Sequence, residues 1–356
     1  MRRVLLLSLL LLMTGVAAVQ SETGGIWDVF LQRGAGENGS DALIFVDGLT
    51  GNSQTVSVQG ERYTPLRDGI LFYDASQRRI LIARPDQTVE PHPFIRMDAE
   101  ARRIDWIVSE DGRAIAWTLT YGTPEAITTI TSVITPEIPR PQLVLEDGPQ
   151  VGVRALPIAF NETHSLLYMD TYPDGLERYV AYKLYAGLFQ LDLSTGETSP
   201  LPGEPGCFCG AGVRRDKFVR LGLSGDLSGF DVHYFDLTSG QDRHIDAIRL
   251  SNFTQAGDVL VTEDGTLAVY ALSDVSDFGT PEQSIRTVFM LIDLLSMEQR
   301  PLTEPITTYV HPLLWTEDNS AILFTSTQRD GTWKVSLDTG ELLKVAEATY
   351  LGSIQG

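Results

Sequence analysis

Short apolar runs separated by polar turns repeat along most of this chain. Residues 109–118 combine an acidic turn, Ser-Glu-Asp-Gly, with the apolar run Ile-Ala-Trp, and residues 316–325 repeat that arrangement. Runs such as residues 127–134 are rich in β-branched residues, which favour strands. Beyond the N-terminal segment, no stretch shows the 3.6-residue period of an amphipathic helix. The pattern predicts an all-β protein built from small repeated sheets.

A second type of turn recurs between the acidic ones. Residues 191–197 (Leu-Asp-Leu-Ser-Thr-Gly-Glu) have close counterparts at residues 235–241 and 336–341. An Asp side chain can bond to the backbone of such a turn, and Gly can adopt the positive φ that closes a hairpin. Each repeat therefore holds two hairpins, an acidic one early and an Asp-Leu-Thr-Gly type late. Four strands per unit are typical of a propeller blade.

The spacing of the acidic turns predicts the number of blades. These turns are centred on Asp68, Asp111, Glu162, Asp216, Asp264 and Asp318. Successive turns are 43 to 54 residues apart, which is the length of a four-stranded blade with its loops. Residues 26–58 offer three more strands, and residues 348–354 offer one. Pairing these terminal strands closes a ring of seven blades without exposed edges, and six blades with a frayed N-terminus is the alternative.

The acidic turns resemble those of the TolB-type and WD-repeat-like propeller family, in which a Ser-x-Asp-Gly turn precedes an apolar strand. The matching stretches are residues 109–112, 262–265 and 316–319. The resemblance covers residues 60–345 and is clear in three blades. It departs elsewhere, since the turns at residues 161–163 and 214–216 are kept without the glycine. It implies an exported or periplasmic binding scaffold rather than one particular reaction.

The N-terminal segment and the net charge both indicate an exported protein. Residues 1–21 begin with Met-Arg-Arg, continue with an apolar run and end in small residues, which is typical of a secretory signal peptide. The sequence has no cysteine near the expected cleavage site, so a lipid anchor is not expected. The formal net charge of −20 becomes −22 once Arg2 and Arg3 are removed. Such an acidic surface disfavours nucleic acid and anionic lipid. We expect a single propeller domain over residues 22–356, secreted or periplasmic, monomeric, and not inserted in a membrane.

The long loops fall between the second and third strands of their blades, and loops of this class share one face with the connections between blades. Long loops on a rigid scaffold usually carry binding residues. The candidate binding residues on these loops are Tyr121, Tyr172, Asp174, Asp274, Asp277 and Phe278. Asp274 and Asp277 would also be suited to a cation site between blades. The alternative is that these loops are ordinary solvated insertions.

Two cysteines, Cys207 and Cys209, precede the expected innermost strand of their blade. Alternate residues of a strand face the same way, and a disulfide between positions i and i+2 would be strained. The two thiolates, together with His311, are therefore weak candidates for binding a soft metal. The opposing interpretation is that both cysteines are small buried hydrophobic residues. No cofactor is predicted, although a divalent metal fits these groups.

No catalytic signature occurs in the sequence. Gly222-Leu-Ser-Gly225 lacks the second glycine of a nucleophile elbow. We therefore expect a non-enzymatic binding scaffold that takes a protein or a small extracellular ligand on the long-loop face or at the channel mouth. The first alternative is a propeller enzyme, a metal-assisted hydrolase or lyase with its site at the channel mouth. The second alternative is a structural cell-envelope protein.

Overall fold

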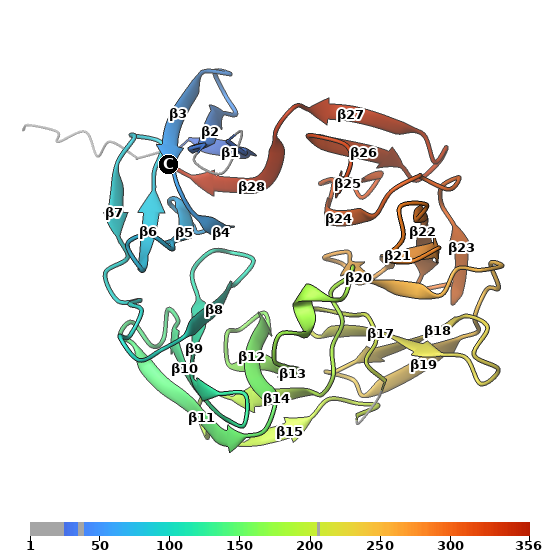
Figure 1. Ribbon diagram of the computed structural model, residues 1–356, viewed down its shortest axis with the longest axis horizontal. Coiled ribbons are helices and arrows are strands. Elements are labelled where there is room, and N and C mark those ends of the chain that lie inside the picture. Colours follow the sequence, from blue (N-terminus) through green and yellow to red (C-terminus); the bar gives the residue numbers. More distant parts are fainter. Residues whose placement is uncertain (1–24, 35–38, 205–206) are drawn as a thin grey trace, which may run out of the picture.

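Seven four-stranded antiparallel sheets form a ring in the computed structural model of this protein (Figure 1). The structure describes residues 25–34, 39–204 and 207–356, and the predicted signal peptide, residues 1–21, lies outside them. The architecture is the predicted all-β propeller. Its blades number seven, so the six-blade alternative is wrong.

The blades are numbered here from the N-terminus, and the strands of each blade are given from the channel outward. Blade 1 contains β28 (Thr349–Gln355), β1 (Ile26–Gln32), β2 (Asp41–Asp47) and β3 (Ser53–Val58). Blade 2 contains β4 (Glu61–Pro65), β5 (Ile70–Asp74), β6 (Arg79–Ala83) and β7 (Val89–Pro91). Blade 3 contains β8 (Arg103–Val108), β9 (Ile115–Thr123), β10 (Ala126–Ile134) and β11 (Gln142–Gln150).

The remaining four blades follow the same order. Blade 4 contains β12 (Val153–Phe160), β13 (Leu166–Pro173), β14 (Leu188–Asp192) and β15 (Thr198–Pro200). Blade 5 contains β16 (Ala211–Arg214), β17 (Lys217–Leu223), β18 (Phe230–Asp236) and β19 (Gln241–Ile245). Blade 6 contains β20 (Gln255–Val261), β21 (Leu267–Ser276), β22 (Ser284–Asp293) and β23 (Glu298–Pro301). Blade 7 contains β24 (Val310–Trp315), β25 (Ala321–Ser326), β26 (Thr332–Ser336) and β27 (Leu342–Ala346).

The two ends of the chain close the ring inside blade 1. β28 supplies the innermost strand and pairs antiparallel with β1, which places Trp27 opposite Ile354. The rings of Phe30 and Tyr350 are 5.2 Å apart across this pair. The predicted pairing of terminal strands is confirmed, and it removes the edge that β1 would otherwise expose.

Hydrophobic side chains fill the space between neighbouring blades. Six clusters join successive blades from blade 1 to blade 7; Phe289 of blade 6 and Phe324 of blade 7, for example, have ring centroids 5.1 Å apart. Among the described residues, no such cluster joins blade 7 to blade 1. There the Thr332 hydroxyl donates to the Ala348 carbonyl at 2.8 Å and accepts from the Tyr350 amide at 2.7 Å.

Both predicted turn types have the expected geometry. The Asp192 carboxylate accepts hydrogen bonds from the amides of Ser194 and Thr195 in the turn between β14 and β15. In the acidic turn between β8 and β9, Gly112 has a φ of +68°, and a Cβ there would lie 2.6 Å from the amide nitrogen of Arg67. The glycine therefore serves both the turn and the close packing of blade 3 against blade 2.

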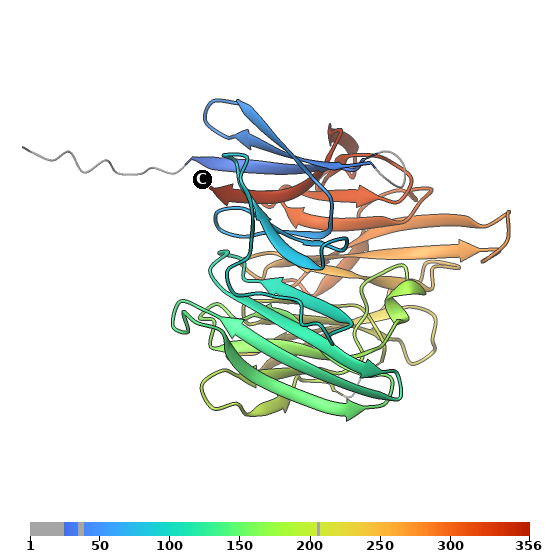
Figure 2. The same cartoon turned by 60° about the vertical axis from the view of Figure 1, so that its left-hand side comes forward.

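The alternation of hairpins separates the loops onto two faces. Loops joining the second and third strands, and those joining one blade to the next, lie on one side, here called the long-loop face. Figure 2 shows this face on its right, where the hairpin of β21 and β22 extends beyond the other loops. The part of the chain that the structure describes includes no helix with the length and apolarity needed to span a membrane.

Candidate binding site at the channel mouth

The loop between β13 and β14, residues 174–187, extends on the long-loop face from blade 4 past blade 5 to blade 6, and it is here called the strap (Figure 1). It contains one helical turn, η1 (Leu176–Arg178). The Tyr182 hydroxyl reaches the hydroxyls of Ser273 and Thr287 in blade 6. The Lys183 amide donates to Asp258 Oδ1 at 2.6 Å, also in blade 6. The strap therefore links blade 4 to blade 6 at the edge of the channel mouth.

A buried arginine holds the start of the strap. The Arg154 side chain, from β12, is fully buried (0% exposed). Its Nη1 donates to Asp105 Oδ2 at 2.9 Å, and its Nη2 lies 3.4 Å from Glu177 Oε2. Its Nε is 2.9 Å from Asp174 Oδ1, an ion pair that lacks hydrogen-bond geometry. A buried guanidinium is costly unless it is paired, and three carboxylates pair it here.

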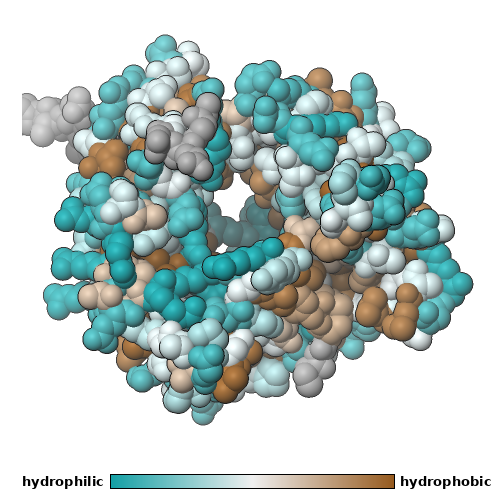
Figure 3. Space-filling view, in the orientation of Figure 1, coloured by the Kyte–Doolittle hydropathy of each residue, from teal (hydrophilic) through white to brown (hydrophobic). Residues whose placement is uncertain are grey.

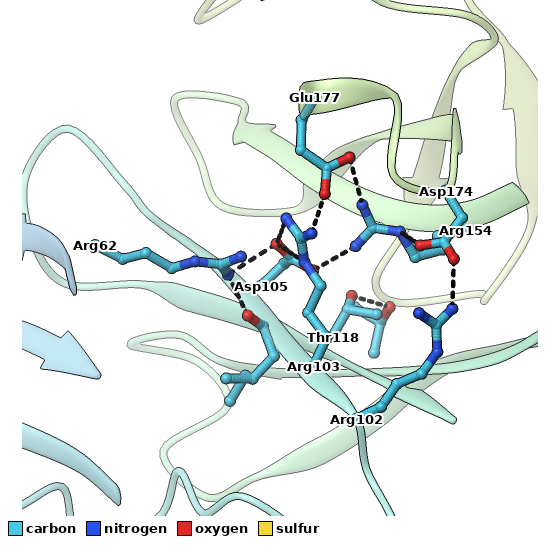
Figure 4. A network of polar contacts seen from close by, with 10 residues as sticks. Arg62, Arg102, Arg103, Asp105, Thr118, Arg154, Asp174 and Glu177 are labelled. Carbon is cyan, nitrogen blue, oxygen red and sulfur yellow. Dashed lines mark hydrogen bonds and ion pairs between the residues drawn. The ribbon is translucent and has the colours of Figure 1, made fainter. Parts of the chain in front are cut away.

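Further arginines complete this network, which Figure 4 shows converging on Asp105. Arg62 Nη1 lies 2.8 Å from Asp105 Oδ1, and Arg103 Nε lies 3.0 Å from Asp105 Oδ2. Arg103 also pairs with Glu177, and Arg102 Nη2 lies 2.8 Å from Asp174 Oδ2. The network, here called the arginine network, consists of Arg62, Arg102, Arg103, Arg154, Asp105, Asp174 and Glu177. It joins blades 2, 3 and 4 at the channel mouth.

The electrostatics of the network keep its carboxylates ionised. Burial would raise the pKa of Asp105, but the charges of Arg62, Arg103 and Arg154 outweigh burial and hold that pKa below its usual range. Burial likewise opposes ionisation of Glu177, yet hydrogen bonding and the two neighbouring arginines lower its pKa. Burial lowers the pKa of Arg154 against the effect of these carboxylates. The site is an ion-pair network in its charged form.

A cavity of about 330 Å³ lies between β12 and the strap, and it is here called the mouth pocket. Its polar and aromatic lining consists of Arg103, Arg154, Glu177, Lys183, Tyr172, Tyr182 and Tyr185, and aliphatic residues complete the walls. Figure 3 views this face and shows strongly hydrophilic residues beside the central hollow, next to an apolar area. A concave site with apolar walls and a few fixed charges is typical of a ligand-binding pocket.

The structure brings together two of the predicted binding residues. Tyr172 lines the mouth pocket with 9% of its surface exposed, and Asp174 belongs to the arginine network. Burial, followed by the charges of Glu177 and Asp170, raises the pKa of Tyr172, so its hydroxyl stays neutral. Tyr121 lies near the end of β9, outside the network and the pocket.

The other three predicted residues lie on the hairpin of β21 and β22. Asp274 is buried and ion-paired with Arg286 on the opposite strand. Asp277 is exposed in the turn with a φ of +53°, and Phe278 at the tip is 74% exposed. This hairpin rises beside the mouth, so five of the six candidates form two separate groups, and Tyr121 lies apart from both. The pairing with Arg286 leaves Asp274 poorly suited to the predicted cation site.

The interpretation of the cysteines as thiolate ligands does not fit the structure. Cys207 and Cys209 form a disulfide, with Cα atoms 5.3 Å apart, just before β16. The chain bends at residue 208 instead of continuing as a regular strand, so the strand geometry on which the prediction relied is absent here. His311 Nδ1 instead lies 2.6 Å from Asp258 Oδ2. Among the residues that the structure describes, no three His, Cys, Asp or Glu side chains gather as metal ligands.

Most of the arginine network was not predicted from the sequence. Arg62, Arg103 and Arg154 stand at the first or second position of three consecutive innermost strands, β4, β8 and β12. Equivalent positions of neighbouring blades face the same channel mouth, so this recurrence of arginine was the available signal. The strap residues Tyr182 and Lys183 carried no such signal, because their partners are distant in the sequence.

Comparison with known proteins supports the fold alone. No protein-family model and no curated protein matches the sequence. A prolyl endopeptidase structure superposes with a TM-score of 0.60 and 11% identity, covering 91% of this chain and 50% of that one. Hydrazine synthase from Kuenenia stuttgartiensis superposes with a TM-score of 0.50 and 12% identity, covering 78% and 76%.

TolB from Acinetobacter baumannii is also similar in fold, with a TM-score of 0.47 and 11% identity over 92% of this chain and 82% of that chain. This similarity is too weak to carry an argument about function. The chain spans half the length of the prolyl endopeptidase, so the activity of that enzyme is not attributed to it. The chain is thus similar to solved β-propellers of several different functions.

Proposed function

We propose that the protein is an exported, non-enzymatic binding module that takes its ligand at the mouth of the central channel on the long-loop face. The observation that carries this proposal is the buried network around Arg154, which fixes the strap over a pocket of about 330 Å³. Rigid walls reduce the entropy that is lost when a ligand binds. The site is therefore organised before any ligand arrives.

The protonation states of the network favour binding over catalysis. A general acid or base works best when its pKa lies near the operating pH. Burial alone would move the carboxylates of Asp105 and Glu177 toward neutrality, but their arginine partners shift both pKa values the other way. Both carboxylates are thus suited to holding structure rather than to exchanging protons.

Export is part of the proposal and rests on the sequence. The basic and apolar N-terminal segment is typical of a signal peptide, and the chain without Arg2 and Arg3 carries a formal net charge of −22. The protruding hairpin with Phe278 at its tip offers a second contact for a larger partner on the same face. A structural envelope role or a channel-mouth enzyme has no comparable support.

A ligand screen combined with hydrogen exchange tests where binding occurs. A library of peptides, sugars, organic acids and amines is screened by thermal shift, and each hit is mapped by amide exchange. We expect protection in residues 172–185 and at the start of β8 and β12, and recovery of the hit unchanged. Arg103→Gln should abolish this protection, whereas Arg113→Gln, an exposed arginine of the acidic turn on the opposite face, should leave it intact.

Three outcomes would contradict the proposal. One is protection confined to the opposite face, for instance at the cavity lined by Trp27 and Arg84. Another is chemical conversion of a hit by the wild-type protein, which would establish an enzyme. A screen in which no library member protects the mouth would also count against a binding role there.

A further inference from the structure

The arginine network carries more positive than negative charge. Four guanidiniums are paired with three carboxylates in it. This surplus of one cation occurs at a concave site of a protein whose formal net charge is −20. A concave surface with one sign of charge concentrates ligands of the opposite sign. The local positive charge therefore favours binding of an anion, although the protein as a whole is negatively charged.

Lys183 adds a second cationic group at the edge of the same pocket. Its ammonium lies 5.4 Å from the centroid of the Tyr185 ring, and in the part of the chain that the structure describes it forms no ion pair with a carboxylate. The Lys183 side chain is exposed, so it remains accessible to a ligand. The Tyr185 side chain, followed by the charges of Asp258 and Asp170, raises the pKa of Lys183, so the ammonium stays protonated although these carboxylates offset part of its charge.

Glu177 already shows how a carboxylate binds here. One of its oxygens pairs with Arg103, and the other lies 3.4 Å from Nη2 of Arg154. The Glu177 side chain is 31% exposed and sits on the short helical turn of the strap rather than on a blade. Arginine forks bind carboxylates through paired N–H groups. An incoming carboxylate would compete with Glu177 for these guanidiniums.

The rest of the pocket suits an apolar group. The Tyr182 hydroxyl is occupied by Ser273 and Thr287, so this residue offers its ring to the pocket. Tyr172 packs beside Phe208 with ring centroids 6.1 Å apart. The volume of about 330 Å³ is at the small end of ligand pockets, which span about 300–1,000 Å³. The pocket is sized for one side chain rather than for a folded surface.

Building on the proposed function, we infer that the mouth pocket binds a ligand bearing one carboxylate on an aromatic or aliphatic body. The carboxylate lies between Arg103 and Lys183, and the apolar body lies between Tyr172 and Tyr182. Because the Glu177 carboxylate already pairs with the guanidiniums of Arg103 and Arg154, these groups suit a planar carboxylate, and phosphate is the alternative that the test excludes. The same chemistry is found at the free C-terminus of a peptide that ends in an apolar residue and in a free aryl-alkanoic acid.

Calorimetric titration with matched probes tests the ligand class. The probes are N-acetyl-Ala-Ala-Phe with a free carboxylate, the same peptide as its C-terminal amide, 3-phenylpropionate and phenyl phosphate. We expect the free-acid peptide or 3-phenylpropionate to bind at least about tenfold more tightly than the amide, which is the factor for one charge-assisted contact. A stronger response to the peptide than to 3-phenylpropionate identifies a chain terminus as the source, and the reverse identifies a small acid.

Variants with opposite expected effects separate recognition from loss of structure. Lys183→Gln should weaken binding of the better free acid by roughly fivefold, and Arg103→Gln by more than about tenfold. Glu177→Gln should strengthen it severalfold, because the internal competitor is removed. Lys344→Gln is the matched control and should leave affinity unchanged, because this half-buried lysine lies on the outer strand β27 and pairs with exposed Glu347. A damaged pocket would weaken binding in all three pocket variants.

The inference is overturned if the amide or phenyl phosphate binds as tightly as the free acids, or if Glu177→Gln weakens binding. It is also overturned if neither free acid binds. These failures are distinguishable from failure of the proposed function. A neutral or cationic library hit that protects the strap would leave the binding module intact while excluding a carboxylate ligand.

Discussion

Arg154 and His92 show how single buried polar groups constrain this propeller. Arg154 is fully buried because three carboxylates surround its guanidinium. His92 is also buried, with 9% of its surface exposed, and its Nδ1 accepts hydrogen bonds from the amides of Phe94 and Ile95. Burial lowers the pKa of His92 to about 4, against the attraction of Asp68. The two residues thus satisfy burial in opposite ways, one charged and paired, the other neutral.

The lowered pKa of His92 predicts a loss of stability in mild acid. The unfolded chain binds a proton at this histidine near pH 6.5, whereas the folded protein binds it near pH 4. The folded state is therefore penalised as the pH falls through this window, by about 3 kcal/mol in total. In the His92→Asn variant, the asparagine side-chain oxygen can replace Nδ1 as the hydrogen-bond acceptor. We expect the free energy of unfolding of this variant to fall less than that of the wild type between these pH values. Chemical denaturation at each pH measures the difference, and parallel curves would contradict the assignment.

The strand β28 is the element on which the closed ring depends. It arrives from the C-terminus, pairs with β1 and places Ile354 in the core shared by blades 1 and 2, with 3% of its surface exposed. Blades 7 and 1 share no hydrophobic cluster among the described residues, so closure relies on this strand rather than on packing across the junction. Its contribution is expected to exceed that of an outer strand of the same length.

A pair of matched alanine substitutions tests the role of β28. Ile354→Ala should lower the free energy of unfolding by about 3 kcal/mol, because the cavity left in the core cannot fully collapse. Leu343→Ala on the outer strand β27, where the side chain is 56% exposed, should change it by no more than about 0.5 kcal/mol. Urea denaturation of both variants measures the contrast. Equal effects would show that the junction is held by other contacts.

For the whole molecule, the dominant property is an excess of negative charge on a closed ring. The formal net charge of −20 acts on a scaffold in which many of the described arginines form ion pairs. Like charges spread over a compact body oppose folding, and salt screens them. Buried pairs such as that of Arg154 are screened much less. The predicted monomeric state follows from the same repulsion and stays a prediction.

Salt should therefore stabilise the folded protein. Raising sodium chloride from about 10 mM to about 500 mM shortens the Debye length from about 30 Å to less than about 8 Å, which removes most of the repulsion between exposed carboxylates. We expect the midpoint of thermal unfolding, Tm, to rise over this range in scanning calorimetry. A Tm that falls with salt would mean that surface ion pairs, rather than net repulsion, dominate the energetics.

The sequence by itself determined the blades, because strand alternation and turn chemistry act over a few residues. The acidic turns at Asp111 and Asp318 and the turn at Asp192 recur at intervals that leave room for one four-stranded sheet each. Even the shared blade was predictable, since residues 26–58 lacked one strand and the C-terminal segment had a spare one. The long-loop face, with Tyr172 and Asp174 on it, follows from the same local logic.

Only the tertiary structure decided which charged residues meet and what the strap does. Arg154 and Asp105 are separated by 49 residues, and Tyr182 and Ser273 by 91, so no local pattern links them. The radial arrangement of blades brings the starts of β4, β8 and β12 to one channel mouth. The tertiary structure likewise decided the backbone conformation of residues 207–209. It is not that of a regular strand, and it allows the disulfide that strand geometry had disfavoured. Contacts between blades depend on the closed ring, and the ring exists only after all seven sheets have packed.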